Sequence, residues 1–512
     1  MAHVRAAALK RALPFLGLLP VALYLMGVYP VYVARVTVGV VGLITLATWR
    51  SPPEFTPWLE RAARVLLVLV PFAVAFHQVT RVVAGMMGVD FAIFTQASHA
   101  IARTGVPTTT LLFDEPVNFL SHHFAPVLYL PGLVTWLGVP APYALIACYA
   151  LSFGLALWAL RRFCIGAGLP AATATLWTLV VALSPSIRPE ILWGVHDEIF
   201  ALPLAGWSLV LLQERRWWPS LALAASTVVA KESFFMFPFV WCVLAWTLQR
   251  SPDPLIPSGV EGRGRNGPLD SARGERIVIA GTVALVWLAA GGVYVLGHPW
   301  WSGREFDHLN RFALSALGTG TEDRVLFVAA LLGPLLAFPL RSRSALLWCL
   351  PALPFIALCL LSSDPEMFRP TGYHATIPAY LLGFAGAVGL KSTGGKWLSS
   401  QMVVMTLLAA QLSWEVTALR LPLRLALAAQ WYPAPELALL PKDQVVAADP
   451  AAVLSLLDHP GVKRLWRVPL SQQHPGVLVF KPDGWETPGA DVAAGYAPCL
   501  PSGRWTVLCD AP

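Results

Sequence analysis

"PYALIACYALSFGLALWALRR", residues 142–162, is an apolar run that ends on the pair Arg161-Arg162. One helix needs roughly 20 consecutive apolar residues to cross a hydrocarbon core about 30 Å thick. Residues 142–160 approach that length, and basic residues at the end of such a run are typical of the cytoplasmic side of a membrane. The stretch therefore predicts a spanning helix whose C-terminal end lies in the cytoplasm.

The composition of the whole chain agrees with this reading. Of 512 residues, 56% are hydrophobic and only 13% are charged, which is about half the charge of a soluble domain of this size. The net charge is +7 at pH 7. Arginines and lysines in cytoplasmic loops account for that excess, so the charge does not indicate a nucleic-acid partner.

Apolar length and basic flanks together predict about 13 spans, with the N-terminus inside. We expect an N-terminal membrane hairpin at 1–60, a multi-spanning domain at 61–420 with a cytoplasmic linker at 250–276, and an inner (plasma) membrane location. The short apolar stretch 124–138 predicts an interfacial or re-entrant segment. The expected spans are residues 13–28, 30–48, 64–83, 142–160, 168–185, 199–213, 217–230, 234–248, 277–297, 325–340, 344–362, 376–390 and 398–418.

Residues 421–512 differ in composition and predict a small extracytoplasmic α/β domain. "DQVVAADPAAVLSLLDHPGVKRLWRVPL", from Asp443, indicates a strand at 445–448, a helix at 450–457 and a strand at 464–468. "GVLVFKP" and "RWTVLCD" indicate further strands. The expected fold class is thus an all-α polytopic membrane protein that carries a small C-terminal α/β domain.

Two cysteines lie in this tail, and they predict a disulfide. Cys499 and Cys509 bracket Pro501-Ser502-Gly503, which reads as a turn. Disulfides persist in the oxidising compartment expected for the tail. Two unpaired thiols in a frayed C-terminus are the alternative. The other cysteines lie in or beside apolar runs and read as small core residues.

Three residues are candidate catalytic groups, since each carries a charge at the outer end of an expected span. Asp90, in "GVDFAIFTQ", is placed to act as a general base on a substrate hydroxyl, or to cap the helix that follows. Glu198, in "RPEILWGVHDEIF", suits acid–base work or metal ligation. Lys231, in "VVAKESFF", interrupts an apolar run and must be paired or hydrated.

Further polar residues of the outer loops are candidates for binding a substrate phosphate, and solvated loop charge is the alternative for each. His123, His196 and Glu198 are also candidate ligands of a divalent metal, although their spacing is not a recognised metal motif. Arginine offers a planar fork that suits phosphate oxygens. The candidate binding residues are Gln96, His122, His123, His196, Glu232, Arg304, Arg369, Tyr373 and His374.

Several motifs of the chain resemble the membrane proteins grouped as domain of unknown function 2079. The resemblance covers most of the chain from about residue 60 and is carried by "DFAIFTQ", "SHHFAPVLYLPGLV", "HDEIFALPL", "AKESFF", "GYHATIPAYLLG" and "VVAADPAAVLSLLDHPGVKRLWRVP". That family is similar to the C-type glycosyltransferases, which span the membrane many times and use polyprenyl-phosphate sugars. In this wider group an acidic residue of the first large outer loop acts on the acceptor, and Asp90 matches that position.

The chain departs from the family pattern at two places. Asp90-Phe91-Ala92 stands where members usually have Asp-Leu-Gly, and Lys231-Glu232-Ser233 stands where they have Lys-Glu-Asp. The second departure removes an acid, which weakens the case for a full catalytic or metal role at that point.

The sequence therefore predicts an inverting transfer of a sugar from a polyprenyl-phosphate donor to an acceptor outside the cytoplasm. The bilayer and the lipid-linked sugar are the expected partners, and no Walker A motif indicates ATP hydrolysis. A transporter or flippase of a lipid-linked or anionic substrate is the alternative, since charges within spans also suit transport. A non-catalytic scaffold is a third reading.

Overall fold

The computed structural model of the chain describes residues 57–113, 115–184, 186–187, 194–250, 281–294, 296–297, 320–333, 335, 338–368, 373–392, 432–465, 475–481, 488, 495–500 and 505–510. The expected spans 13–28, 30–48 and 398–418 and the linker 250–276 lie outside the described residues, except for Arg250.

Spatial proximity divides the chain into two compact units. The first unit comprises residues 1–71, 152–191 and 198–418. The second comprises residues 72–151, 192–197 and 419–512, so the C-terminal tail is grouped with the first expected outer loop. The boundaries 1–60, 61–420 and 421–512, which rest on apolar length, basic flanks and composition, stay predictions.

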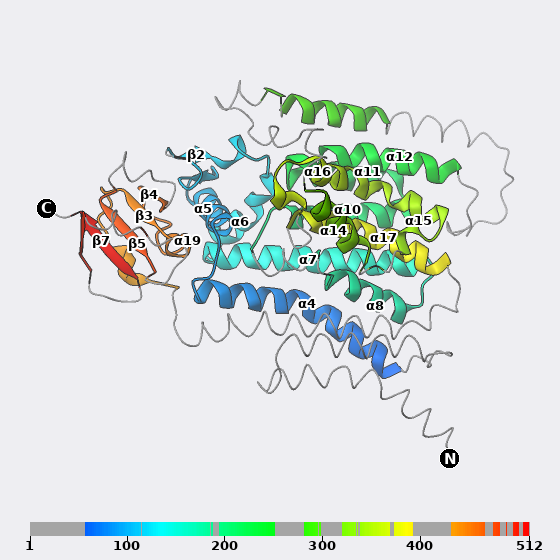
Figure 1. Cartoon of the computed structure of the whole chain (residues 1–512), viewed down its shortest axis with the longest axis horizontal. Helices are drawn as coiled ribbons and strands as arrows, with labels where there is room; N and C mark the ends of the chain where they lie inside the picture. The colour runs from blue at the N-terminus through cyan, green and yellow to red at the C-terminus, as the bar shows by residue number, and fades with distance from the viewer. Residues whose placement is uncertain are drawn as a thin grey trace, which may run out of the picture. The chain divides into compact units, whose positions relative to one another are not determined.

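The first unit is helical in its described part (Figure 1). α4 and α7 each contribute to both units, and one further helix covers Gly281–Tyr294. The helices are α4 (Pro57–Val83), α7 (Ala141–Gly166), α8 (Ala171–Ala182), α10 (Glu198–Gln213), α11 (Trp217–Ser226), α12 (Phe237–Arg250), α14 (Thr321–Leu332), α15 (Arg343–Trp348), α16 (Leu353–Leu361) and α17 (Thr376–Ser392).

Three helical stretches in the described residues are long and apolar enough to cross a membrane. They are Ala63–Val83, Ala141–Gly166 and Arg343–Leu361, which correspond to the expected spans 64–83, 142–160 and 344–362. Several other expected spans coincide with shorter apolar helices, such as Trp217–Val229 and Glu232–Leu248. The chain is thus a mostly helical membrane protein, and the count of about 13 spans stays a prediction.

Helix α17 is buried along nearly its whole length in the first unit, and small residues let it approach its neighbours. The indole nitrogen of Trp177 in α8 donates a hydrogen bond of 2.8 Å to the carbonyl of Gly383. The hydroxyl of Tyr380 donates one of 2.7 Å to the carbonyl of Ala156 in α7. Because both aromatic side chains are buried, these bonds satisfy polar groups that would otherwise be costly in an apolar bundle.

The second unit contains the helix that carries Asp90. After α4, α5 (Val89–Thr104) begins behind Gly88, and it ends at Gly105, whose φ of 77° is left-handed. A short hairpin of β1 (Thr108–Thr109) and β2 (Val117–Asn118) follows. The apolar stretch expected to be interfacial or re-entrant contains η2 (Pro126–Leu128) and α6 (Tyr129–Trp136).

A five-stranded sheet forms the C-terminal part of the second unit, in the order β4-β3-β5-β7-β6 (Figure 1). β3 is parallel to β4 and to β5, whereas β7 is antiparallel to β5 and to β6. The strands are β3 (Val446–Ala448), β4 (Val462–Arg464), β5 (Val477–Phe480), β6 (Tyr496–Pro498) and β7 (Thr506–Asp510), with helix α19 (Pro450–Val453) between β3 and β4.

The expected α/β character is therefore present, with three differences in detail. The helix ends at Val453, and the strand placed at 464–468 lies earlier, at Val462–Arg464. β6 was not expected, because "YAP" shows no alternation of apolar and polar residues. β6 forms because it pairs with β7 at the edge of the sheet.

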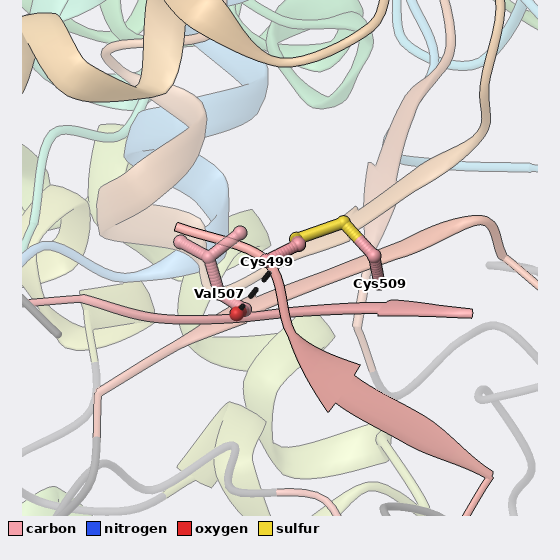
Figure 2. The surroundings of a disulfide bond; sticks show 3 residues. All are labelled: Cys499, Val507 and Cys509. Atoms are coloured by element: carbon pink, nitrogen blue, oxygen red, sulfur yellow. Dashed lines mark hydrogen bonds between the residues drawn. A yellow bond between two sulfur atoms is a disulfide. The ribbon is translucent and has the colours of Figure 1, made fainter. Parts of the chain in front are cut away.

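Figure 2 shows the disulfide between Cys499 and Cys509, whose Cα atoms lie 5.5 Å apart. Cys509 lies in β7, and Cys499 directly follows β6. The backbone amide of Cys499 donates to the carbonyl of Val507 at 3.3 Å. The bond therefore joins the two strands that close this edge of the sheet.

Replacement of both cysteines, C499S with C509S, is expected to destabilise the C-terminal sheet. Closing a loop of about ten residues stabilises by about 2–3 kcal/mol in the chain-entropy view. Chemical denaturation of the purified protein, followed by pulse proteolysis of the C-terminal domain, measures the change. An unchanged midpoint in the double variant would contradict the expected effect.

Substitution of Gly389 by alanine is expected to destabilise the first unit. A Cβ at this position in α17 would overlap the backbone carbonyl of Phe338, which cannot rotate away as a side chain can. Overpacking of this kind costs about 1–3 kcal/mol. Gly292→Ala is the matched control, because nothing lies within 4 Å of a Cβ there. Thermal unfolding should show a loss for G389A and no loss for G292A; equal effects would refute this account of the packing.

Candidate functional site

A buried ion pair joins Lys231 and Glu198 in the first unit. The Lys231 ammonium contacts Oε1 of Glu198. The Glu198 side chain is only 3% exposed and that of Lys231 16%. Charges in such surroundings are costly unless they are paired, so each group stabilises the charge of the other.

A break in the helical path places Lys231 at this point. The helical turn η3 (Thr227–Val229) follows α11, and η4 (Glu232–Met236) leads into α12. Between them, Lys231 is extended, with φ −165° and ψ 147°. The break frees backbone groups from the helical pattern and lets the lysine turn toward the first residue of α10, which is Glu198.

Further polar groups of the first unit interact with Glu198 or with Glu232, the residue that follows Lys231. Glu232 is buried, and Tyr294 lies close enough to interact with it electrostatically. The Cys359 thiol of α16 is within electrostatic range of Glu198 and lies 3.9 Å from the carbonyl of His374. The structure thus brings three separate parts of the chain near one another: Glu198, the consecutive pair Lys231-Glu232, and the backbone at His374.

Asp90 contacts His196 in the second unit. The distance between Asp90 Oδ2 and His196 Nε2 is 3.4 Å, and their side chains are 51% and 11% exposed. Asp90 lies in the first turn of α5, but Gly88 is the N-cap residue. The helix-cap alternative is therefore not the observed arrangement, although a carboxylate in the first turn still favours the helix dipole.

The pairing of a half-exposed carboxylate with a mostly buried imidazole suits acid–base chemistry. The imidazole can orient the carboxylate, while the exposed face of the carboxylate can reach the hydroxyl of a substrate. His196 and Glu198 are separated by one residue in the chain. Each contributes one of the two contacts described above.

Gln96 has an internal role that the sequence did not reveal. Its Oε1 accepts hydrogen bonds from Thr109 Oγ1 at 2.7 Å and from the backbone amide of Thr110 at 2.9 Å. Its Nε2 donates to Thr110 Oγ1 at 2.9 Å. The amide thus fixes the β1 hairpin to α5, and the expected role in binding substrate stays a prediction.

His122 and His123 form part of an aromatic cluster. Their ring centroids lie 4.5 Å apart in an edge-to-face arrangement. Phe113 packs on His122 at 5.5 Å and Phe119 on His123 at 5.9 Å. Such a cluster offers ring faces and polar nitrogens together, so binding by these histidines remains open as a prediction.

The remaining candidates are only partly covered by the structure. Arg304 and Arg369 lie outside the described residues, and of Tyr373 only the backbone is described. No group of three or more His, Cys, Asp or Glu side chains in the described part of the chain could hold a metal ion. The candidate metal ligands His123, His196 and Glu198 therefore receive no support from the described geometry.

Arg324 is a buried basic residue that is not among the predicted candidates. Its guanidinium donates to the carbonyls of Leu360 at 2.8 Å and Ser362 at 3.1 Å, and it lies 4.1 Å from the ring centroid of Phe368. These contacts satisfy carbonyls at the C-terminal end of α16. The only sequence signal was an arginine at the start of an apolar run.

Three comparisons with known proteins bear on the identity of the chain. Residues 86–427 match the model of a family described as predicted membrane protein (DUF2079). No curated protein matches the sequence. Among solved structures, ArnT from Cupriavidus metallidurans bound to undecaprenyl phosphate is similar, with 14% identity and a TM-score of 0.49 over 87% of this chain and 98% of that chain. A likeness of this strength carries no inference about the present chain.

Removal of one partner of the buried pair is expected to destabilise the protein more than removal of both. Lys231→Met leaves the Glu198 carboxylate buried without its cation, which costs about 3–5 kcal/mol. Combining it with Glu198→Gln removes the stranded charge and should recover part of that loss. Thermal unfolding of the two single variants and the double variant in one detergent measures the coupling.

Arg162 and Glu214 supply the matched control. They form an ion pair of 2.7 Å beyond the other end of α10, with side chains 51% and 31% exposed. Exposed pairs of this kind contribute about 0–1 kcal/mol, so Arg162→Met should have little effect. If R162M and K231M are equally destabilising, burial does not govern the energetics of the Lys231 pair.

Proposed function

Since the chain belongs to the DUF2079 family of predicted membrane proteins, we propose that it is a membrane glycosyltransferase with a polyprenyl-phosphate sugar donor. The acceptor lies outside the cytoplasm, and the transfer inverts the anomeric configuration. The proposal includes a C-type architecture of about 13 spans in the inner membrane, with the C-terminal sheet on the outer side.

The observation that carries this proposal is the Lys231 ammonium, held by Glu198 among apolar helices. A polyprenyl-phosphate sugar joins a long apolar chain to an anionic phosphate. Its tail suits apolar helices, and its phosphate needs a cation close to that apolar region. A phosphate oxygen can compete with Glu198 for Lys231, because both ligands are anionic oxygen acceptors.

Asp90 supplies the general base of the proposed reaction. It accepts the proton of the acceptor hydroxyl, and the hydroxyl oxygen attacks the anomeric carbon of the donor sugar. The new glycosidic C–O bond forms as the C–O bond to phosphate breaks, and that electron pair leaves with the polyprenyl phosphate. His196 keeps the carboxylate oriented through the contact at 3.4 Å.

Cations stabilise the leaving group in this scheme. Lys231 offsets the charge that develops on the phosphate as the bond breaks. Arg304 and Arg369 are proposed to assist, since a guanidinium fork matches two phosphate oxygens. His122, His123, Tyr373 and His374 are proposed to contact the donor or the acceptor. The proposal requires Asp90 and Lys231 to serve one reaction.

One observation favours a second candidate, a flippase for a lipid-linked anion. Transporters bind ions where helices are broken, and the chain is broken at Lys231 between η3 and η4. Reconstitution with a fluorescent polyprenyl-phosphate sugar separates the two functions. A flippase moves the intact lipid between leaflets, whereas a transferase cleaves the sugar from it and needs an acceptor.

Asp90→Asn is expected to abolish sugar transfer without loss of folded protein. Removing a general base costs about 10²–10⁴-fold in rate. A strain that lacks the protein should accumulate one polyprenyl-phosphate sugar, which identifies the donor. The wild-type chain should clear this pool, and D90N should leave it in place at equal abundance in the membrane.

Asp323→Asn is the matched control, because Asp323 is also an exposed aspartate in the first turn of a helix, α14. It should clear the pool as the wild type does. Clearance by D90N would exclude Asp90 as the base. A deletion strain with an unaltered lipid-linked sugar profile would exclude this donor class.

A further inference from the structure

Lys481 links the C-terminal sheet to the turn that follows α4, within the second unit. It directly follows β5, and its ammonium donates a hydrogen bond to the carbonyl of Gly85. The same ammonium lies 5.7 Å from the ring centroid of Trp505, which is buried beside it. The contact connects residues 396 positions apart in the sequence.

Lys481 lies at the carboxyl ends of the parallel strands, where α/β domains commonly bind their ligands. β3 has β4 on one side and β5 on the other, and all three are parallel. The chain passes from β3 to β4 on one side of β3 and then from β4 to β5 on the other side. The carboxyl ends of the strands at such a switch point form the usual binding crevice. Asp449 follows β3 there, and Lys481 follows β5.

In this chain, Lys481 at the carboxyl end of β5 contacts the turn that follows α4. The turn after α4 is closed by hydrogen bonds from Gly85 N to the carbonyl of Val82 and from Met86 N to that of Arg81. Gly85 has a left-handed φ of 62°. The carbonyls at such a helix end carry partial negative charge, which favours cations nearby. Arg81 donates to the carbonyl of Met86 at 2.7 Å, and Lys481 donates to that of Gly85.

The position of this turn sets the start of α5. Only residues 86–88 separate Gly85 from the first residue of α5, and Asp90 is the second residue of that helix. The N-cap Gly88 has no side chain to hold the helix start. The location of Asp90 thus depends on how firmly the preceding turn is held.

Other contacts within the second unit attach the second half of α5 and the hairpin that follows it to the same C-terminal domain. His99 and Arg103 of α5 each lie 3.0 Å from Oδ1 of Asp458. Thr110 Oγ1, which also bonds Gln96, donates to the carbonyl of Val462 in β4. The C-terminal domain therefore contacts the second half of α5, and Lys481 acts on the turn before the end that carries Asp90.

We propose that Lys481 is a positioning residue, through which the C-terminal sheet clamps the 84–88 turn and fixes the placement of Asp90. The role of Asp90 as a base rests on the proposed function, but the clamp itself does not. The binding edge of the sheet is then used for an intramolecular contact rather than for a separate ligand.

The electrostatics of the clamp agree with this role. Burial lowers the pKa of Lys481, and the charge of Asp449 opposes that shift. Burial likewise raises the pKa of Asp449, and both Lys481 and the backbone amide of Ala451 oppose it. Asp449 therefore helps to keep Lys481 charged, as the contact with Gly85 requires.

Amide hydrogen exchange of the full-length protein in nanodiscs tests the clamp. Lys481→Met keeps the alkyl stem beside Trp505 and removes the charge. Loss of a charge-assisted hydrogen bond should speed exchange across residues 84–92 by about tenfold or more. Lys481→Arg retains a cation and should restore most of the protection.

Exchange in β3 and β5, together with a control variant, distinguishes a positioning role of Lys481 from a general loss of structure. Exchange in β3 and β5 should stay unchanged in K481M, which shows that the sheet remains folded. Lys442→Met, at an exposed lysine of the same domain, should leave residues 84–92 unchanged. Unaltered exchange at 84–92 in K481M, or equal acceleration in β3 and β5, would overturn the proposal.

Clearance of the lipid-linked sugar pool provides the functional readout. K481M should slow clearance and K481R should recover it, at equal membrane abundance. If D90N clears the pool normally, the glycosyltransferase proposal fails, and hydrogen exchange at 84–92 still decides the clamp. If D90N blocks clearance while K481M neither slows clearance nor speeds exchange at 84–92, the clamp is refuted and the proposed function stands.

Discussion

The cost of an uncompensated charge in apolar surroundings is the constraint on which the described structure depends. With 56% hydrophobic residues, the chain buries charged groups at low cost only where an ion-pair partner or hydrogen-bond acceptors compensate the charge. Lys231 meets Glu198 for this reason. The helical path breaks at Lys231, so that the lysine can turn toward α10. The extended backbone at Lys231 and the ion pair with Glu198 thus occur together in the first unit.

The same constraint applies to backbone carbonyls at helix ends, and cationic side chains meet it repeatedly. Arg324 bonds the carbonyls of Leu360 and Ser362 at the end of α16. Arg81 and Lys481 do the same after α4. Arg324 and Lys481 also join segments that are 36 and 396 positions apart in the chain. The bond from Lys481 to the carbonyl of Gly85 thus holds the turn after α4, and this turn leads into α5, which carries Asp90.

The candidate site could be predicted in its residue types more than in its partnerships. Asp90, Glu198 and Lys231 were identified because charge next to an apolar run is conspicuous in a sequence. Their partners were not identified, since contact between Lys231 and Glu198 depends on how α10 lies against the broken helix. Gln96 was predicted to bind substrate because it is a polar residue close to Asp90 in the sequence. In the structure its side-chain amide forms hydrogen bonds with Thr109 and Thr110. Arg324 was missed because an arginine at the edge of a span usually reads as loop charge.

The sequence by itself determined the membrane class, three long spans, the small C-terminal sheet and the family, because these follow from local composition, periodicity and shared motifs. Hydrophobic length and alternation act over a few residues, so they can be read without knowledge of distant contacts. Only the tertiary structure decided the strand β6, the contact of Asp90 with His196, and the bond from Lys481 to Gly85. Each joins segments through geometry that no local pattern encodes. Pairing across a sheet edge and ion pairing between elements depend on where the whole unit brings the chain together.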